Sequence, residues 1–178
     1  MNIRNAPLVL TPALFCLPLL ASADAGTLIY GNTSGWTVHT DPANNFRCFA
    51  EAQYEGGSTI RLGFESAAGG TLYLSLSDAS WMQAASDGAP PLELKIDERE
   101  PMSFDPEVAD SGALVVRVPT AGRASFLEGF TLGYTLNATL GDSETIMLSL
   151  GGSMRATRML NECQDSMAKA SQVSQAAQ

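Results

Sequence analysis

Few residues in this chain of 178 have side chains suited to acid–base or nucleophilic catalysis. His39 is the single histidine, so a Ser-His-Asp or Cys-His mechanism would have to use it. Ser34 and Asp41 are its neighbours in sequence, but the alternation of apolar and polar residues places His39 on the outward face of a strand. We therefore expect an ordinary surface histidine, and the count of one excludes a metal site built from histidines.

The densest group of carboxylates lies between residues 97 and 110, in a loop that also contains two prolines. Its acidic members are Asp97, Glu98, Glu100, Asp105, Glu107 and Asp110. They lack the Asp-x-Asp-x-Asp-Gly order of a calcium loop, and no spacing singles out a pair for glycoside hydrolysis. We expect a solvated loop with no metal bound. A hydrolase that uses these acids is kept as an alternative.

No motif indicates a bound cofactor or a serine nucleophile. The sequence has no Gly-x-Ser-x-Gly, no phosphate-binding glycine loop and no dinucleotide fingerprint. Gly151-Gly152-Ser153 is explained by a turn from a strand into a helix. We expect no cofactor and no catalytic residue.

The first 23 residues have the three-part layout of a cleavable signal peptide. Arg4 precedes an apolar run over residues 7–20, and Ala21-Ser22-Ala23 gives a small-residue cleavage site. The apolar run, about 14 residues long, is too short to span a bilayer, which needs about 20. We expect a periplasmic or secreted protein without a transmembrane anchor.

Export determines how the cysteines are used. Cys16 is removed with the signal peptide, which leaves Cys48 and Cys163 in an oxidising compartment. An even pair there predicts a structural disulfide between the two. Neither belongs to a Cys-x-x-Cys motif, so redox or zinc chemistry is not expected.

Between residues 26 and 150, apolar and polar residues alternate in short runs separated by Gly, Asp, Asn and Pro. This pattern predicts a mainly β fold, an antiparallel β-sandwich or partly closed barrel. Thr120 could cap a short helix over residues 120–128. Ser153 could be the N-cap of a longer C-terminal helix packed on the sheet through an apolar stripe that includes Cys163. We expect one domain over residues 24–170 and a disordered tail over 171–178.

Two tryptophans require separate interpretations. Trp36 begins a predicted strand and is expected in the core. Trp81 and Met82 lie in a polar loop over residues 78–91, where Trp81 could either plug the sheet or form a contact with a partner.

The net charge of the chain is −9, and it becomes −10 when Arg4 leaves with the signal peptide. Nucleic acids and anionic lipid surfaces require clustered cations, which this sequence lacks, so neither is an expected partner. A negative surface keeps an exported protein soluble, and a basic partner remains compatible with it.

Several short motifs occur in a recognisable order. They are Gly35-Trp36-Thr37-Val38, Cys48-Phe49-Ala50, the Trp81 loop, and Leu148-Ser149-Leu150-Gly151-Gly152-Ser153 leading to Cys163-Gln164. This order resembles small exported bacterial proteins similar to the invasion-associated locus B family. The resemblance implies a periplasmic or secreted β-sandwich-like domain from a Gram-negative bacterium, with no catalytic residues to carry over.

These observations favour a non-enzymatic domain that binds a protein or an envelope component. The first alternative is an inhibitor of a secreted or host enzyme, which would present a protruding loop around Trp81. The second is the hydrolase built on the acids of residues 97–110. The oligomeric state is left open by the sequence.

Export and disulfide formation can be tested together. We expect the protein recovered from the periplasm or medium of a Gram-negative host to begin at Asp24, or about two residues later, and to contain no free thiol. Intact mass spectrometry with and without reduction, after thiol alkylation, measures both. Two alkylated cysteines in the unreduced exported protein would contradict the pairing.

Overall fold

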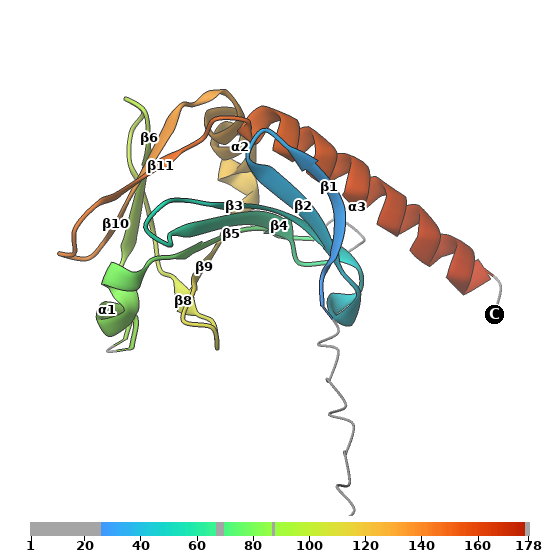
Figure 1. The fold of residues 1–178 in the computed structure, drawn as a ribbon, viewed down its shortest axis with the longest axis horizontal. Coiled ribbons are helices and arrows are strands. Elements are labelled where there is room, and N and C mark those ends of the chain that lie inside the picture. Colours follow the sequence, from blue (N-terminus) through green and yellow to red (C-terminus); the bar gives the residue numbers. More distant parts are fainter. Residues whose placement is uncertain (1–25, 67–69, 87, 177–178) are drawn as a thin grey trace, which may run out of the picture.

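The computed structural model of the protein describes residues 26–66, 70–86 and 88–176. The predicted signal peptide, residues 1–23, and Cys16 within it lie outside the described residues. In the described residues, two antiparallel sheets of seven and four strands are accompanied by helices (Figure 1). The predicted mainly β, sandwich-like architecture is confirmed, and the sheets do not close into a barrel.

The larger sheet has the strand order β1-β2-β3-β4-β5-β9-β8. Its first five strands form a meander, because each pairs with the next along the chain. The bounds are Leu28–Thr33 (β1), Trp36–Asp41 (β2), Arg47–Gln53 (β3), Thr59–Phe64 (β4), Leu72–Ser77 (β5), Glu107–Val108 (β8) and Leu114–Arg117 (β9).

The smaller sheet has the order β11-β10-β6-β7. Its strands are Leu92–Ile96 (β6), Met102–Phe104 (β7), Thr135–Leu140 (β10) and Ile146–Ser149 (β11). The helical elements are η1 (Pro42–Asn44), η2 (Ala79–Trp81), α1 (Met82–Ser86), η3 (Thr120–Gly122), α2 (Arg123–Leu132) and α3 (Ser153–Ala176).

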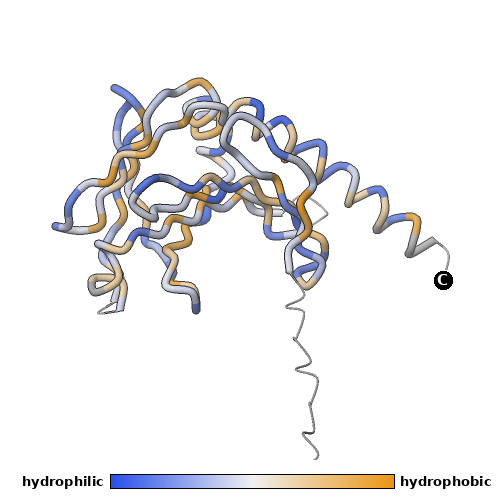
Figure 2. Tube along the Cα trace, viewed as in Figure 1, coloured by the Kyte–Doolittle hydropathy of each residue, from blue (hydrophilic) through white to orange (hydrophobic). Residues whose placement is uncertain are grey.

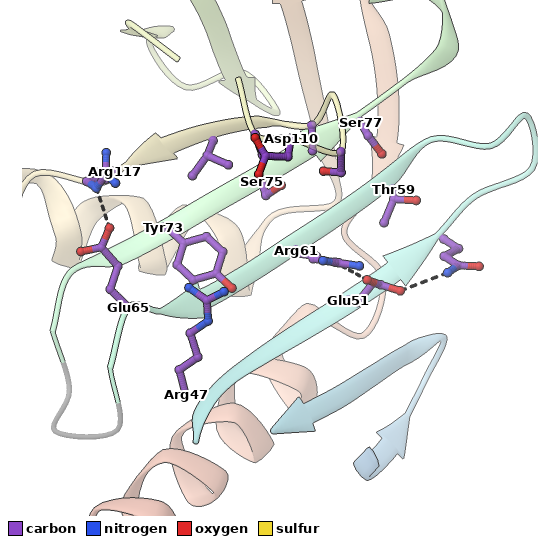
Figure 3. A pocket seen from close by; sticks show the side chains of 15 residues that line it. Arg47, Glu51, Thr59, Arg61, Glu65, Tyr73, Ser75, Ser77, Asp110 and Arg117 are labelled. Atoms are coloured by element: carbon purple, nitrogen blue, oxygen red, sulfur yellow. Dashed lines mark hydrogen bonds and ion pairs between the residues drawn. The ribbon is translucent and has the colours of Figure 1, made fainter. Parts of the chain in front are cut away.

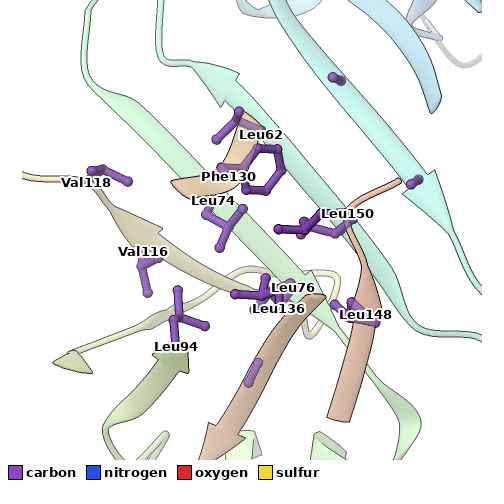
Figure 4. Close-up of a cluster of buried hydrophobic side chains, with 14 of the residues drawn as sticks. Leu62, Leu74, Leu76, Leu94, Val116, Val118, Phe130, Leu136, Leu148 and Leu150 are labelled. Atoms are coloured by element: carbon purple, nitrogen blue, oxygen red, sulfur yellow. The ribbon is translucent and has the colours of Figure 1, made fainter. Parts of the chain in front are cut away.

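The two sheets meet through leucine side chains that alternate along their strands (Figure 4). Leu62, Leu74 and Leu76 of the larger sheet are at most 1 % exposed. The facing residues of the smaller sheet are equally buried: Leu94, Leu136 and Leu148. Burial of one such side chain contributes about 2 kcal/mol, so this cluster is the main stabilising contact between the sheets.

The short helix predicted over residues 120–128 is present but longer. A single 3-10 turn, η3, leads into α2, which continues to Leu132. Phe126 and Phe130 are buried and stack with ring centroids 5.9 Å apart. Thr120 does not cap this helix: Pro119 precedes the turn, and no side-chain cap is formed there.

The long helix α3 covers the core side of strands β1 to β4 (Figure 1). Ala156, Leu160 and Cys163 of its predicted stripe are completely buried, whereas Met159 and Met167 are partly buried against the core. Hydrophilic and hydrophobic residues alternate along the helix in Figure 2, as expected for a helix with one face against a sheet.

A disulfide joins this helix to the sheet. Cys48 of β3 and Cys163 of α3 are bonded, with their Cα atoms 6.2 Å apart. Beside the bond, Gln164 is 5 % exposed. Its side-chain amide bridges the backbone of β3 and that of the segment after β4. Its Oε1 accepts a hydrogen bond from the Cys48 N–H at 3.3 Å, and its Nε2 donates to the Ser66 carbonyl at 2.8 Å.

The turn that starts α3 docks on the hairpin between β1 and β2. Gly152 has a φ of +86°, and a Cβ atom there would lie 2.5 Å from the Ser34 carbonyl oxygen. The Trp36 indole N–H donates to the Gly151 carbonyl at 3.0 Å. Glycine is therefore required at residue 152 for both its backbone conformation and the close approach.

The C-terminal part of α3 extends past the sheet (Figure 1). The helix runs to Ala176, so residues 171–176, expected to be disordered, are helical. The segment contains no glycine or proline that would end the helix after its packed part.

Removal of the disulfide should lower stability strongly. Replacement of both Cys48 and Cys163 by alanine frees a loop of 115 residues in the unfolded state, and we expect a loss of about 4 to 5 kcal/mol in the free energy of unfolding. Urea unfolding followed by far-UV circular dichroism measures the loss. An unchanged unfolding midpoint would show that the helix is held by packing alone.

Candidate functional site

The outer face of the larger sheet, on the side opposite the core, is hollowed. A cavity of about 530 Å³ is lined by outward-facing residues of β3, β4, β5 and β9 and by residues 109–113 (Figure 3). We call this cavity the sheet hollow. Since side chains alternate along each strand, the strands that bury leucines in the core also supply the polar lining of the hollow.

One row of residues, which we call the floor, crosses the outer face of the sheet from strand to strand and lines the hollow at Tyr73 and Arg117. The register pairs His39 with Phe49, Phe49 with Gly63, Gly63 with Tyr73, and Tyr73 with Arg117. The His39 and Phe49 rings stack at a centroid distance of 4.9 Å and an interplanar angle of 15°.

Gly63 allows this row to pack closely. A Cβ atom at residue 63 would lie 2.7 Å from both the Phe49 Cβ and the Tyr73 hydroxyl oxygen. The Tyr73 ring therefore lies over the glycine, an arrangement that covers a strand glycine with an aromatic ring from its neighbour. Phe49 and Tyr73 are 4 % and 8 % exposed, so the floor is closed.

Three arginines stand in the hollow, each paired with acids. The Arg61 Nε contacts Glu51, and the Arg47 Nε contacts the Asp41 carboxylate at 3.3 Å. Arg117 pairs with Glu65 through its Nε at 2.5 Å and with Glu107 through Nη1.

Two of these guanidinium groups also lie on aromatic rings. The Arg61 Cζ is 5.0 Å from the Phe49 ring centroid, and the Arg47 Cζ is 5.9 Å from that of Tyr73. An arginine held by a carboxylate on one side and a ring beneath loses less conformational freedom when it binds a ligand.

Burial shifts the pKa values of two side chains of the floor, His39 and Tyr73. Burial lowers the pKa of His39, and Arg61 lowers it further while the Glu51 carboxylate acts in the opposite direction. Burial also raises the pKa of Tyr73 despite the opposing effect of Arg47 and Arg61. Both shifts favour the neutral form, so the outer face carries a neutral imidazole and a neutral phenol at neutral pH.

The tryptophan considered as a contact residue is part of the core. Trp81 is 1 % exposed, and its indole N–H donates to the Glu144 carbonyl at 3.4 Å. Asp78 caps the η2 turn by accepting the Ser80 N–H at 2.8 Å, which directs Trp81 inward. Met82, the next residue, is 70 % exposed.

The acids of residues 97–110 are dispersed rather than gathered. Asp97 accepts hydrogen bonds from the backbone N–H groups of Tyr134 and Thr135, and Glu98 pairs with Lys95 at 3.7 Å. Asp110 alone of this group lines the hollow. Among the described residues, no three His, Cys, Asp or Glu side chains form a group that could hold a metal ion.

Sequence reasoning missed the arginines of the hollow. Arg47, Glu51 and Gln53 alternate with apolar residues along β3, and Arg61 has the same outward position in β4. Charges of both signs at outward positions of neighbouring strands were the available signal. His39 is on the outer face as expected, although it is partly covered by its stacking on Phe49.

Comparison with known proteins identifies the fold. No protein-family model matches the chain, and no curated protein is similar to it in sequence. The crystal structure of invasion associated protein B from Bartonella henselae is similar, with a TM-score of 0.55 at 12 % identity. The match covers 75 % of this chain and 96 % of that one. The described part of the chain contains no helix with the length and apolar character needed to cross a bilayer.

Substitution of Gly63 tests the close-packed floor. We expect Gly63→Ala to destabilise the protein by about 1 to 3 kcal/mol, because the added methyl group overlaps Phe49 and Tyr73. Gly122→Ala is the matched control, since a Cβ atom there meets nothing within 4 Å. Chemical unfolding of both variants measures the difference, and equal stabilities would mean that the floor is not packed as described.

Proposed function

We propose that this protein is an exported, non-enzymatic binding domain, periplasmic or secreted, and that the sheet hollow is its binding surface. The observation that carries the proposal is the hollow itself, an open polar cavity of about 530 Å³ whose lining includes three arginines and the ring of Tyr73. Its size is in the range of small-ligand clefts. The partner is an envelope component or a protein.

Three further observations support export. The first 23 residues have the composition of a signal peptide, and the remaining two cysteines are bonded. The structurally similar Bartonella protein is named as invasion-associated, which is consistent with a role at or outside the cell envelope. A disulfide-pinned scaffold suits a domain that works without a reducing environment.

Binding is favoured over hydrolysis by how the acids of the hollow are used. Glu51 and Glu65 are each in an ion pair with an arginine of the same surface. Paired in this way, they position guanidinium groups rather than face a substrate as an acid and a base. Asp110 lines the hollow, but no other acid of residues 97–110 does.

The feature that suggested an enzyme inhibitor is absent from the Trp81 segment. That alternative required a protruding loop with Trp81 exposed, whereas the Trp81 ring is packed in the core. Met82 is exposed at the same place, but a single methionine on a five-residue helix does not form an inhibitory loop.

Partly filling the hollow should weaken binding. We expect isotope-labelled mature protein titrated with solubilised envelope fractions to show amide shifts on the outward residues of β3, β4, β5 and β9. Ser77→Trp fills part of the hollow without removing an ion pair, and it should weaken the binding at least tenfold.

The matched control is Ser103→Trp, an exposed strand residue of the smaller sheet. It should bind like the wild-type protein. Amide shifts confined to another surface, or unchanged binding by Ser77→Trp, would show that the hollow is not the binding surface.

A further inference from the structure

The arginines of the hollow present one particular part of their side chains to solvent. Arg47 and Arg61 both use their Nε atoms for the carboxylates of Asp41 and Glu51. Within the described part of the chain, neither arginine donates a hydrogen bond from its Nη atoms. The Nη fork is the end of a guanidinium that matches a carboxylate through two parallel hydrogen bonds.

The ion pairs are arranged with the acid below and the arginine above. The side chains of Asp41 and Glu51 are 10 % and 11 % exposed, whereas those of Arg47 and Arg61 are 32 % and 49 % exposed. A ligand entering the hollow therefore meets the positive groups first. The carboxylates beneath them act as positioning residues.

The rest of the lining is rich in hydroxyl and amide groups. Ser75 and Ser77 are outward residues of β5, and Thr59 of β4 lies beside Ser77 (Figure 3). Gln53 of β3 is paired with Thr59 in the strand register. The aromatic rings of the floor are covered, so no apolar anchor of the kind that dominates protein interfaces is exposed there. This lining suits a ligand that is itself rich in hydroxyl groups.

The charge of the hollow limits how acidic such a ligand can be. Arg47, Arg61 and Arg117 are accompanied there by five acids: Glu51, Glu65 and Asp110 line the hollow, and Asp41 and Glu107 pair with Arg47 and Arg117. The chain as a whole is acidic, with a net charge of −9. A densely charged polyanion would be repelled, while separate carboxylates between neutral hydroxyl groups complement the Nη forks.

We propose that the sheet hollow binds a short glycan that carries carboxylate groups, with the Nη forks of Arg47 and Arg61 holding the carboxylates. The hydroxyl side chains of β4 and β5 hydrogen-bond the sugar hydroxyls. This assignment rests on the proposed function, because it names the ligand class of the same surface.

The test compares two ligands that differ only in whether they carry carboxylate groups. Mature protein is titrated calorimetrically with a galacturonic acid trisaccharide and with its carboxyl-reduced, neutral counterpart. We expect the acidic trisaccharide to bind at least tenfold more tightly than the neutral one, and its affinity to fall as salt is added. Equal affinity for the two ligands would overturn the proposal, as would tighter binding of an acidic peptide of equal charge.

Arginine variants identify the contact. Arg61→Gln should lose at least tenfold in affinity for the acidic trisaccharide, and Arg61→Lys should recover only part of it because lysine lacks the fork. Arg158→Gln is the matched control: it removes the same charge from an exposed ion pair on α3. An Arg61→Gln protein that folds normally and binds with unchanged affinity would contradict the assignment. If that variant does not fold, the comparison of the two trisaccharides on the wild-type protein decides.

Failure of this assignment can be distinguished from failure of the proposed function. If neither trisaccharide binds but envelope fractions still shift the outward amides of β3, β4, β5 and β9, the glycan class is wrong and the hollow remains a binding surface. If the envelope fractions shift no residue of the hollow either, both proposals are wrong.

Discussion

Strand β3 can form its disulfide bond to α3 in only one orientation. Cys48 must point to the core side to reach Cys163, and alternation then sends Arg47 and Phe49 to the outer side. A slip of one residue in the pairing of this strand would break the bond and move the floor of the hollow into the core. The disulfide thus determines which face of the larger sheet is apolar and which carries the arginines.

The outer face shows how charged side chains can cover a sheet without a second layer. Phe49 and Tyr73 are buried on that face by His39 and by two arginines rather than by other strands. Because Gly63 has no side chain, Tyr73 lies flat and the arginines come close to the rings. The same contacts that protect the aromatic floor from water also fix the direction of the guanidinium groups, so the packing of the floor and the orientation of the arginines have a common origin.

The sequence predicted the parts of the fold that have local or pairwise causes. Alternation indicated the strands, the position of Ser153 indicated the start of α3, and the even pair of cysteines indicated the disulfide. The orientation of Trp81 could not be predicted, because it depends on a turn capped by Asp78 and on the space between the sheets. The hollow was missed for a similar reason: Arg117 joins Arg47 and Arg61 only through the pairing of β5 with β9, across a long separation in sequence.

Helix α3 has a well-anchored half and a half that projects into solvent. Cys163 and Gln164 are its last fully buried side chains, and the described side chains from Lys169 onward are exposed. Fraying from the C-terminus can therefore reach Lys169 without disturbing a core contact; beyond it lie Met167, partly buried against the core, and the covalent bond at Cys163. Amide hydrogen exchange along α3 would then slow in steps toward the disulfide, so that protection within one helix ranges from low in its projecting turns to high beside Cys163.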